Sequence, residues 1–265
     1  MKSLCTLLAV SGILVPAISR GSLISAYTFD ETSGTAAADF VRGGGGTGNL
    51  NGGSSFASGK IGNAIELDGS TGYVLAPNVI GTGTTAYSVS AWVFADSATT
   101  WGTIVKNWGG SFTGAFHLGF DNVSGRISNY VSTPTVGPVI APATLSLGAW
   151  HHVALTYNGG SATQILYIDG LQVAIGSASS SLTALGTNMG IGVKTNNATT
   201  APDPSAPGWW DGRIDDLAFF NNVLTPAEVL QIKNNGDLGI SVTVPEPASA
   251  AVLVLGMAGL IRRRR

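Results

Sequence analysis

An alternation of side chains with a period of two, over residues 87–94, constrains the fold of this chain more than any other feature of its sequence. The segment reads YSVSAWVF. Successive side chains of a β-strand point to opposite faces of a sheet, whereas the apolar residues of a helix recur every three or four positions. The segment is therefore predicted to be a strand, with these two faces: Ser88, Ser90, Trp92 and Phe94, and Tyr87, Val89, Ala91 and Val93.

The same character recurs in four further segments, which are WHHVALTY (150–157), ILYI (165–168), LQVAI (171–175) and IDDLAFF (214–220). The dipeptide Asp169-Gly170 lies between the second and the third. It is a strong signal for a two-residue hairpin, because both central residues of that turn need a positive φ. Short strands separated by Gly, Asn and Pro turns predict an all-β fold, an antiparallel sandwich of two sheets.

A single short helix is predicted near the C-terminal end of this β-rich region. Thr225-Pro-Ala-Glu228 forms a capping box with proline at the first helical position. Gly236 is expected to stop the helix. The apolar residues between these signals are Val229, Leu230 and Ile232.

Composition and charge argue against two classes of protein. Residues 20–240 contain 14 Asp and Glu against 8 Lys and Arg, a net charge near −6, and show no basic patch, which argues against nucleic-acid binding. The many glycines would suit a disordered chain, but regularly spaced aromatic and β-branched residues favour a packed core. A stretch of this length without an internal repeat is expected to form one domain, residues 20–240.

Six segments, in this order, resemble the laminin-G-like or concanavalin-A-like jelly roll of many bacterial surface proteins. The resemblance covers nearly all of residues 25–236 and implies two packed antiparallel sheets, often with a structural calcium ion, and binding of sugars or proteins. The fold alone does not define the function. The segments are AYTFDETSGTAAADF, GKIGNAIELDGSTGYV, YSVSAWVFA, LGAWHHVALTYNG, LYIDGLQVA and DGRIDDLAFFNNVLTPAEV.

The N-terminal segment, residues 1–19, is predicted to be a secretory signal peptide. Lys2 provides a positive start, residues 4–15 are apolar, and Ala17 and Ser19 are the small residues that a cleavage site requires. A membrane anchor is the alternative. Cys5, the one cysteine, lies in this segment, so the mature chain is expected to contain no disulfide bond.

The C-terminal segment places an apolar run between Pro-Glu-Pro and an arginine cluster. Residues 248–261 would form a helix of about 21 Å, which is short of a bilayer core of about 30 Å. The order of features resembles the PEP-CTERM sorting signal of Gram-negative bacteria, which implies export, temporary membrane anchoring and processing by exosortase. A buried C-terminal helix is the alternative. The signal would cover residues 241–265, with the motif residues Pro245, Glu246, Pro247, Arg262, Arg263, Arg264 and Arg265.

Glycoside hydrolysis occurs on some concanavalin-like sandwiches, and retaining enzymes need two carboxyl groups about 5 Å apart. Glu66 and Asp68 are followed by no third acid, and the group Asp211, Asp215 and Asp216 lacks a glutamate. No G-x-S-x-G elbow of a serine hydrolase is present, although a Ser-His-Asp arrangement from distant parts of the chain stays open. The chain is therefore predicted not to be an enzyme.

Histidines and glycines offer weaker candidates for a site. His151 and His152 are adjacent on a predicted strand, so they face opposite sides and cannot converge on one ion or substrate atom. His117 is isolated on another predicted strand. Residues 43–48 match G-x-G-x-x-G, but no βαβ unit surrounds them, so a glycine-rich surface loop is expected rather than a phosphate site.

Four aspartates are the candidate ligands of a structural calcium ion, because Ca²⁺ prefers carboxylate and carbonyl oxygens. The first and last strands of a jelly roll commonly lie side by side, which would bring Asp30 near Asp215 and Asp216. Carboxylates gathered there without basic partners would repel one another unless an ion bound. Ordinary solvated or hydrogen-bonded aspartates are the alternative. The set is Asp30, Asp39, Asp215 and Asp216.

Three tryptophans in Gly- and Pro-rich segments are candidate sugar-binding residues: Trp101, Trp108 and Trp209. An exposed indole could stack on a sugar ring, and packing of the loops against the sandwich is the alternative. Trp92 and Trp150 lie in periodic strands and are expected in the core.

The sequence thus predicts an exported, non-catalytic binding or adhesion protein of the cell envelope or the exopolysaccharide matrix, with carbohydrate as its ligand. A purely structural matrix protein and a glycan-active hydrolase are the alternatives. The expected partners are exosortase, the secretion machinery, the membrane and a polysaccharide or surface protein, and nucleic acid is not expected.

Overall fold

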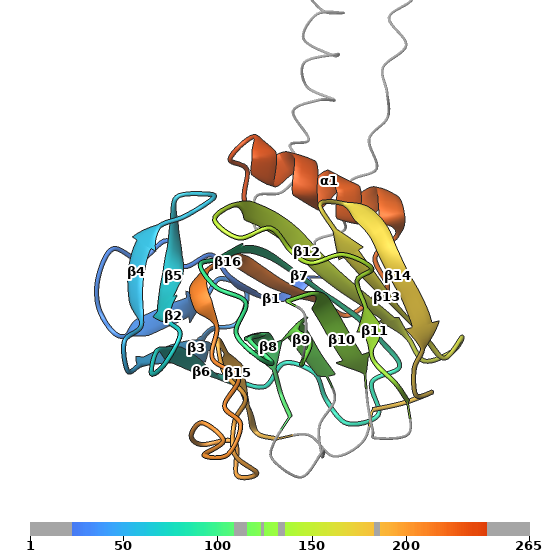
Figure 1. Cartoon of the computed structure of the whole chain (residues 1–265), viewed down its shortest axis with the longest axis horizontal. Coiled ribbons are helices and arrows are strands. Elements are labelled where there is room, and N and C mark those ends of the chain that lie inside the picture. Colours follow the sequence, from blue (N-terminus) through green and yellow to red (C-terminus); the bar gives the residue numbers. More distant parts are fainter. Residues whose placement is uncertain (1–22, 109–115, 123–124, 132–135, 183–185, 243–265) are drawn as a thin grey trace, which may run out of the picture.

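The computed structural model describes residues 23–108, 116–122, 125–131, 136–182 and 186–242. They form two antiparallel sheets that pack face to face, with a helix across the outer face of one sheet (Figure 1). The predicted signal peptide and the predicted sorting residues 245–247 and 262–265 lie outside these residues. Within the described part of the chain, no helix is long and apolar enough to cross a membrane.

The first sheet, called sheet A, has eight strands among the described residues, in the order β14-β13-β12-β7-β16-β5-β4, with β1 paired to β16. Their bounds are β1 (Leu23–Tyr27), β4 (Ser55–Ser58), β5 (Asn63–Asp68), β7 (Ala86–Ala95), β12 (Trp150–Asn158), β13 (Thr163–Ile168), β14 (Leu171–Ser177) and β16 (Asp211–Phe220). The two longest strands, β7 and β16, are neighbours at its centre.

The second sheet, sheet B, also has eight strands in the described ranges, in the order β11-β10-β9-β8-β15-β6-β3-β2. Their bounds are β2 (Ala36–Asp39), β3 (Gly43–Asn51), β6 (Tyr73–Pro77), β8 (Thr103–Lys106), β9 (Phe116–Phe120), β10 (Ile127–Val131), β11 (Val139–Ile140) and β15 (Asn188–Ile191). The all-β sandwich of two sheets predicted from the sequence is confirmed.

The predicted hairpin is also confirmed. Strands β13 and β14 pair directly, and the two residues between them, Asp169 and Gly170, have φ values of 51° and 79°. Positive φ at both central positions is the type I′ geometry that matches the twist of the flanking strands. The three other predicted strand segments, 87–94, 150–157 and 214–220, all lie within strands, with ends shifted by up to three residues.

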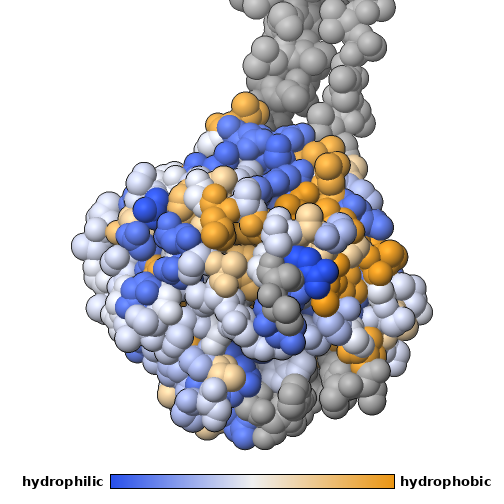
Figure 2. All heavy atoms as spheres, in the orientation of Figure 1, coloured by the Kyte–Doolittle hydropathy of each residue, from blue (hydrophilic) through white to orange (hydrophobic). Residues whose placement is uncertain are grey.

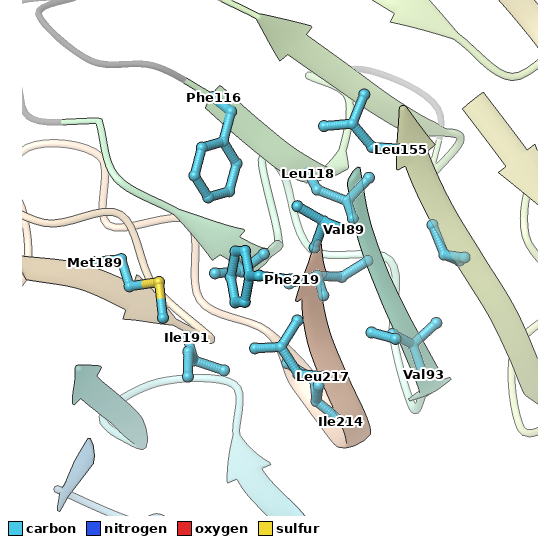
Figure 3. Close-up of a cluster of buried hydrophobic side chains, with 14 of the residues drawn as sticks. Val89, Val93, Phe116, Leu118, Leu155, Met189, Ile191, Ile214, Leu217 and Phe219 are labelled. Carbon is cyan, nitrogen blue, oxygen red and sulfur yellow. The ribbon is translucent and has the colours of Figure 1, made fainter. Parts of the chain in front are cut away.

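The apolar core fills the space between the two sheets. Figure 3 shows side chains from both sheets meeting there, with Val89, Leu155, Leu217 and Phe219 from sheet A and Leu118, Met189 and Ile191 from sheet B. Trp210, at the entry to β16, is fully buried and stacks on Phe120 at 4.9 Å between ring centroids. Trp210 was not predicted from the sequence to lie in the core.

The helix α1 (Pro226–Asp237) covers the outer face of sheet A with a second apolar cluster, so both faces of the central strands are buried. Its N-terminus has the predicted capping box between Thr225 and Glu228. The expectation that Gly236 stops the helix was wrong, because the helix continues to Asp237. Gly236 is instead a contact residue: a Cβ there would lie 2.3 Å from Trp92 Nε1.

The glycine-rich segment 43–48 also differs from the expectation. It is not a loop but part of strand β3, which pairs with β2 and β6. Close approach explains two of its glycines. A Cβ on Gly46 would lie 2.6 Å from the side chain of Asp39, and one on Gly48 would lie 2.7 Å from Val74 Cγ1.

Exposed apolar side chains gather on the side of the molecule where β14 and one end of α1 lie (Figure 2). β14 is the edge strand of sheet A, and Leu171 and Ile175 on it are 65% and 59% exposed. Leu230 of α1 lies close to Gly170 in the hairpin turn, which connects the helix to this edge. This apolar surface belongs to sheet A, whereas the pocket described below is built on sheet B.

The contact between Gly236 and Trp92 gives a first prediction. Gly236→Ala should lower the free energy of unfolding by about 1–3 kcal/mol, although alanine is the better helix former, because the added methyl group overpacks against the indole. Asn234→Ala, in the same turn but exposed, should be neutral or slightly stabilising. Chemical denaturation of both variants measures the difference, and a stabilised Gly236→Ala protein would contradict this packing.

Candidate functional site

A pocket of about 230 Å³ on sheet B is the first candidate site, called here the aromatic pocket. It contains two of the three tryptophans predicted as sugar-binding residues. Its lining residues are Trp101, Lys106, Trp108, Tyr130, Lys194 and Ala206.

The strand register explains why these side chains meet. Lys106 of β8 lies directly opposite His117 of β9, which lies opposite Tyr130 of β10. Their neighbours Val105 and Leu118 point into the core. Because side chains alternate along a strand, the row of Lys106, His117 and Tyr130 faces away from the core.

The two tryptophans flank strand β8 in the sequence and both lie beside Tyr130. The centroid of the Tyr130 ring is 6.0 Å from that of Trp101 and 5.6 Å from that of Trp108, and the Trp108 contact is edge-to-face. Trp101 has a φ of 60°, which is rare for a residue other than glycine, and its N–H donates to the carbonyl of Asp121. The backbone of Trp101 is thus held in an unfavourable conformation by the surrounding contacts, and this conformation places the indole at the pocket.

Two ammonium groups accompany the aromatic rings. Lys106 is only 7% exposed, and its Nζ lies 5.1 Å from the centroid of the Trp108 ring. Burial, with a contribution from Lys194, lowers the pKa of Lys106 to about 7. Lys194 forms an ion pair of 2.7 Å with Asp203. The pocket therefore combines apolar ring surface with positive charge.

His117, the middle residue of this row, lies beneath the pocket and is fully buried. Burial, and then the charge of Lys106, hold its pKa well below the usual range, so the imidazole is neutral. Its Nε2 lies 3.3 Å from the carbonyl oxygen of Phe120. The ring also lies edge-on to Trp101 and Tyr130. This packing gives His117 a structural place beneath the aromatic rings.

Trp209, the third predicted tryptophan, lies elsewhere. Its ring is 6.0 Å from that of Tyr73, and its carbonyl oxygen accepts a hydrogen bond from Thr99. Among the tryptophans expected in the core, Trp92 is buried, but Trp150 is only partly buried, beside Phe94.

Four residues of the pocket were not predicted from the sequence: Lys106, Tyr130, Lys194 and Ala206. The alternation in 127–131 could have placed Tyr130 on the outer face, but only the register of three strands brings it to Lys106.

A second candidate site lies where strand β16 changes its partner. One edge of β16 pairs with β5 at residues 211–214 and with β1 at residues 217–220, and the register shifts between these two parts. Asp215 and Asp216 lie at this change. The end of β1 and the start of β5 meet there, which brings Asp30 and the turn at residues 59–62 to the same place.

The carboxyl groups of Asp215 and Asp216 are buried. Asp215 Oδ2 accepts a hydrogen bond from the N–H of Ile61 at 2.8 Å, and Asp215 Oδ1 has no hydrogen-bond partner among the described residues. Burial raises the pKa of Asp215 to about 8, and the charges of Asp216 and Asp30 add to the shift. Burial likewise raises the pKa of Asp216 to about 6, although Ser241 Oγ donates to it at 2.7 Å. Two carboxylates would thus be unstable here without a cation.

Asp39, the fourth predicted calcium ligand, has its own partners. Its carboxylate accepts hydrogen bonds from Ser25 Oγ at 2.6 Å and Arg42 Nε at 2.6 Å, and from three backbone N–H groups. Burial opposes ionisation, but the hydrogen bonds from Ser25 and Arg42 hold the pKa of Asp39 below its usual range. These contacts give Asp39 a structural role, separate from the other three aspartates.

One observation favours a metal ion at Asp215 and one argues against it. The first is the orphaned Oδ1 of a fully buried carboxyl group. The second is that no three His, Cys, Asp or Glu side chains of the described residues are arranged to hold an ion. An ion there would need backbone oxygens or water to complete its shell, which Ca²⁺ accepts readily.

His151 connects a serine and an aspartate that are distant from each other in the sequence. Its Nε2 lies 2.6 Å from Ser146 Oγ, and its Nδ1 lies 2.8 Å from Asp169 Oδ2. Asp169 Oδ1 accepts the N–H of His152 at 3.0 Å, so the aspartate ties the hairpin turn to the start of β12. These contacts follow the Ser–His–Asp order of a serine hydrolase, but Ser146 is exposed in the segment before β12 and does not lie on a nucleophile elbow.

The remaining candidates have structural partners. His152 is buried on the opposite face from His151, as predicted, beside Ser90 at 2.8 Å. Glu66 pairs with Arg213 at 3.4 Å across the strands, and Asp68 accepts three backbone N–H groups of the following turn. Burial opposes ionisation of Asp68, but the hydrogen bonds from Thr71, Gly72 and Ser70 hold its pKa below the usual range, whereas a general acid needs a raised pKa.

Comparison with known families gives two matches. The model of the concanavalin A-like lectin/glucanases superfamily matches residues 68–230, more than half of the chain, and the model of the PEP-CTERM protein-sorting motif matches residues 243–265. Both confirm the resemblances seen in the sequence. No curated protein matches the chain.

Solved structures with the same fold are distant in sequence. Domain 4 of AbnA, a GH43 extracellular arabinanase from Geobacillus stearothermophilus in complex with arabinotriose, is 21% identical, with a TM-score of 0.61 over 80% of this chain and 98% of that one. The botulinum neurotoxin serotype D binding domain is 16% identical, with a TM-score of 0.60 over 81% and 52%. Trypanosoma rangeli sialidase in complex with sialic acid is 16% identical, with a TM-score of 0.64 over 90% and 36%.

The buried carboxyl group of Asp215 gives a prediction about pH. Between pH 4 and pH 8 this carboxyl group is protonated in the folded protein but ionised in the unfolded protein. The free energy of unfolding therefore falls as pH rises from about 4 to about 8. In chelator, Asp215→Asn should remove most of this fall, on the order of 2–5 kcal/mol. Denaturation at pH 5 and pH 8 measures it, with exposed Asp96→Asn as the control. Equal pH slopes for the wild type and Asp215→Asn would refute the assignment.

Proposed function

This chain belongs to the concanavalin A-like lectin/glucanases superfamily, and we propose that it is an exported, non-catalytic protein that binds carbohydrate in the cell envelope or the exopolysaccharide matrix. The observation that carries the proposal is the aromatic pocket, where two indoles and a phenol surround a cavity of about 230 Å³. The PEP-CTERM motif supports export and processing by exosortase.

The chemistry of the pocket suits a sugar ring. A pyranose presents an apolar face of C–H groups and a rim of hydroxyl groups, and aromatic side chains offer rigid apolar surface with some polar groups. Trp101 and Tyr130 are partly exposed, so their rings are open to a ligand. The cavity is smaller than the roughly 300–1,000 Å³ that enclose drug-sized ligands, which suits a single ring.

An adjoining depression supports a longer chain of sugars. Lys194 and Ala206 line both the aromatic pocket and a neighbouring pocket of about 560 Å³. Asn196 and Ser205 in that pocket offer hydrogen-bonding groups for hydroxyls. A polysaccharide would thus place one ring among the aromatic side chains and continue along the 194–206 loop.

The non-catalytic character is part of the proposal. The carboxyl groups Glu66 and Asp68 have structural partners, and the Ser146–His151–Asp169 arrangement serves to tie a hairpin to its neighbour. The arabinanase domain shows that the same fold carries an arabinotriose ligand in another protein. The alternative, a purely structural matrix protein, would leave the aromatic pocket without a ligand.

We also propose that a calcium ion binds beside Asp215. Asp215 Oδ1 would ligate it, with Asp216 and Asp30 adding negative charge. The ion would supply the positive charge that two buried carboxylates need, and it would fasten β1, β5 and β16 where they meet. Asp39 is not included, because Arg42 already balances its charge.

The carbohydrate proposal predicts a loss of binding on truncation of the pocket. Trp101→Ala should weaken binding to polysaccharides at least tenfold, because the aromatic surface that stacks on the sugar ring is removed. Trp209→Ala, which removes a tryptophan outside the pocket, should leave the affinity unchanged. A glycan array and calorimetry on the purified protein measure this. No binding to any glycan would favour the structural alternative, and release of reducing sugar would contradict the non-catalytic assignment.

The calcium proposal predicts a change in melting temperature. An ion at a hundredfold excess over its Kd stabilises the folded protein by about 2.7 kcal/mol, which is roughly 5–10 °C for a domain of this size. Calcium in place of chelator should therefore raise the melting temperature of the wild type and of Asp96→Asn, but not of Asp215→Asn. Identical melting curves for the wild type under the two conditions would end the proposal.

A further inference from the structure

Lys106 is a buried cation without a carboxylate partner. Lys106 is 7% exposed, and among the described residues it takes part in no ion pair, whereas Lys60, Lys194 and Lys233 all do. Every acidic residue of the chain except Glu246 lies in the described ranges. The missing counter-charge is therefore not one of those acids.

The groups that face Lys106 do not neutralise it. Asp203 is bound to Lys194 at 2.7 Å, so that pair contributes little net charge. His117 of β9 is neutral, and Tyr130 of β10 keeps its proton because burial raises its pKa. The pocket thus holds one ammonium group in excess whenever Lys106 is protonated.

This excess charge costs stability. Removing an ammonium group from water is unfavourable, and the ring of Trp108, at 5.1 Å, returns only part of that energy through a cation–π contact. An apolar side chain of similar length would fill the same space without the penalty. The position of the charge, at the wall of an open pocket, indicates that a ligand provides its partner.

We infer that the aromatic pocket binds an acidic sugar, a uronic acid, with its carboxylate on Lys106 and its ring against the partly exposed rings of Trp101 and Tyr130. This inference rests on the proposed carbohydrate-binding function. A uronic acid has the three features that this pocket can bind: an apolar ring face for the aromatic side chains, hydroxyl groups for polar neighbours, and one negative charge for the ammonium group. A neutral sugar would displace water from the pocket with its ring and still leave the ammonium group of Lys106 without a partner.

The titration of Lys106 gives the inference a second readout. In the protein without ligand the pKa of Lys106 is about 7. An acidic ligand should bind the form in which Lys106 is protonated, and its binding should raise that pKa. Affinity should therefore be highest near pH 6 and fall above pH 7, by up to tenfold per pH unit. The ligand carboxylate is already ionised over this range, so it does not cause the fall.

The experiment compares matched acidic and neutral sugars by calorimetry at low salt and pH 6. The probes are trigalacturonate against galactotriose and methyl glucuronide against methyl glucoside. We expect about tenfold tighter binding of each acidic member. Lys106→Met should remove this preference and the pH dependence, whereas Lys60→Met, at another lysine that lies over an indole, should keep both.

Two further measurements guard against misfolding. Lys106→Met should raise the melting temperature of the free protein, because it removes a buried unpaired charge, and Lys106→Arg should retain the preference for acidic sugars. Equal binding of acidic and neutral sugars would overturn this inference and leave the carbohydrate-binding function standing. Binding of neither class would overturn both.

Discussion

The pairing of β16 with three other strands is the interaction on which the rest of the structure depends. β16 comes near the end of the fold, yet it lies at the centre of sheet A, with β7 on one edge and β5 and β1 sharing the other. These pairs join residues that are up to about 200 positions apart in the chain. β16 also completes the core, because its side chains Leu217 and Phe219 fill the space between the sheets.

Both candidate sites contain an ionisable group that the fold buries at a cost. Within the part of the chain that the structure describes, Lys106 has no carboxylate partner, and Asp215 is a carboxyl group with one oxygen that accepts no hydrogen bond. Each departs from the rule that buried charges are paired. A ligand of opposite charge would resolve either one, an acidic sugar at Lys106 and a cation at Asp215. Sites of this kind trade stability of the free protein for binding.

The sequence predicted the strands well and the sites only in part. Alternation in 87–94, the Asp169-Gly170 turn and the Thr225 capping box are local signals, and each is confirmed where it was predicted. The predictions for the glycines at 43–48 and for Gly236 were wrong. Glycine is needed at Gly46, Gly48 and Gly236 because a Cβ there would clash with Asp39, Val74 and Trp92, respectively. Such contacts come from parts of the chain that no local pattern connects.

Sequence alone determined the all-β class, the hairpin, the capped helix and the sorting motif, because periodicity, turn chemistry and motif order are written in neighbouring residues. It also proposed Trp101, Trp108, Asp30, Asp215 and Asp216. Only the tertiary structure decided that Trp209 lies away from the pocket, that Asp39 pairs with Arg42, and that Lys106 and Tyr130 stand beside the indoles. The physical reason is strand register: which side chains become neighbours across a sheet depends on pairings between segments far apart in the chain.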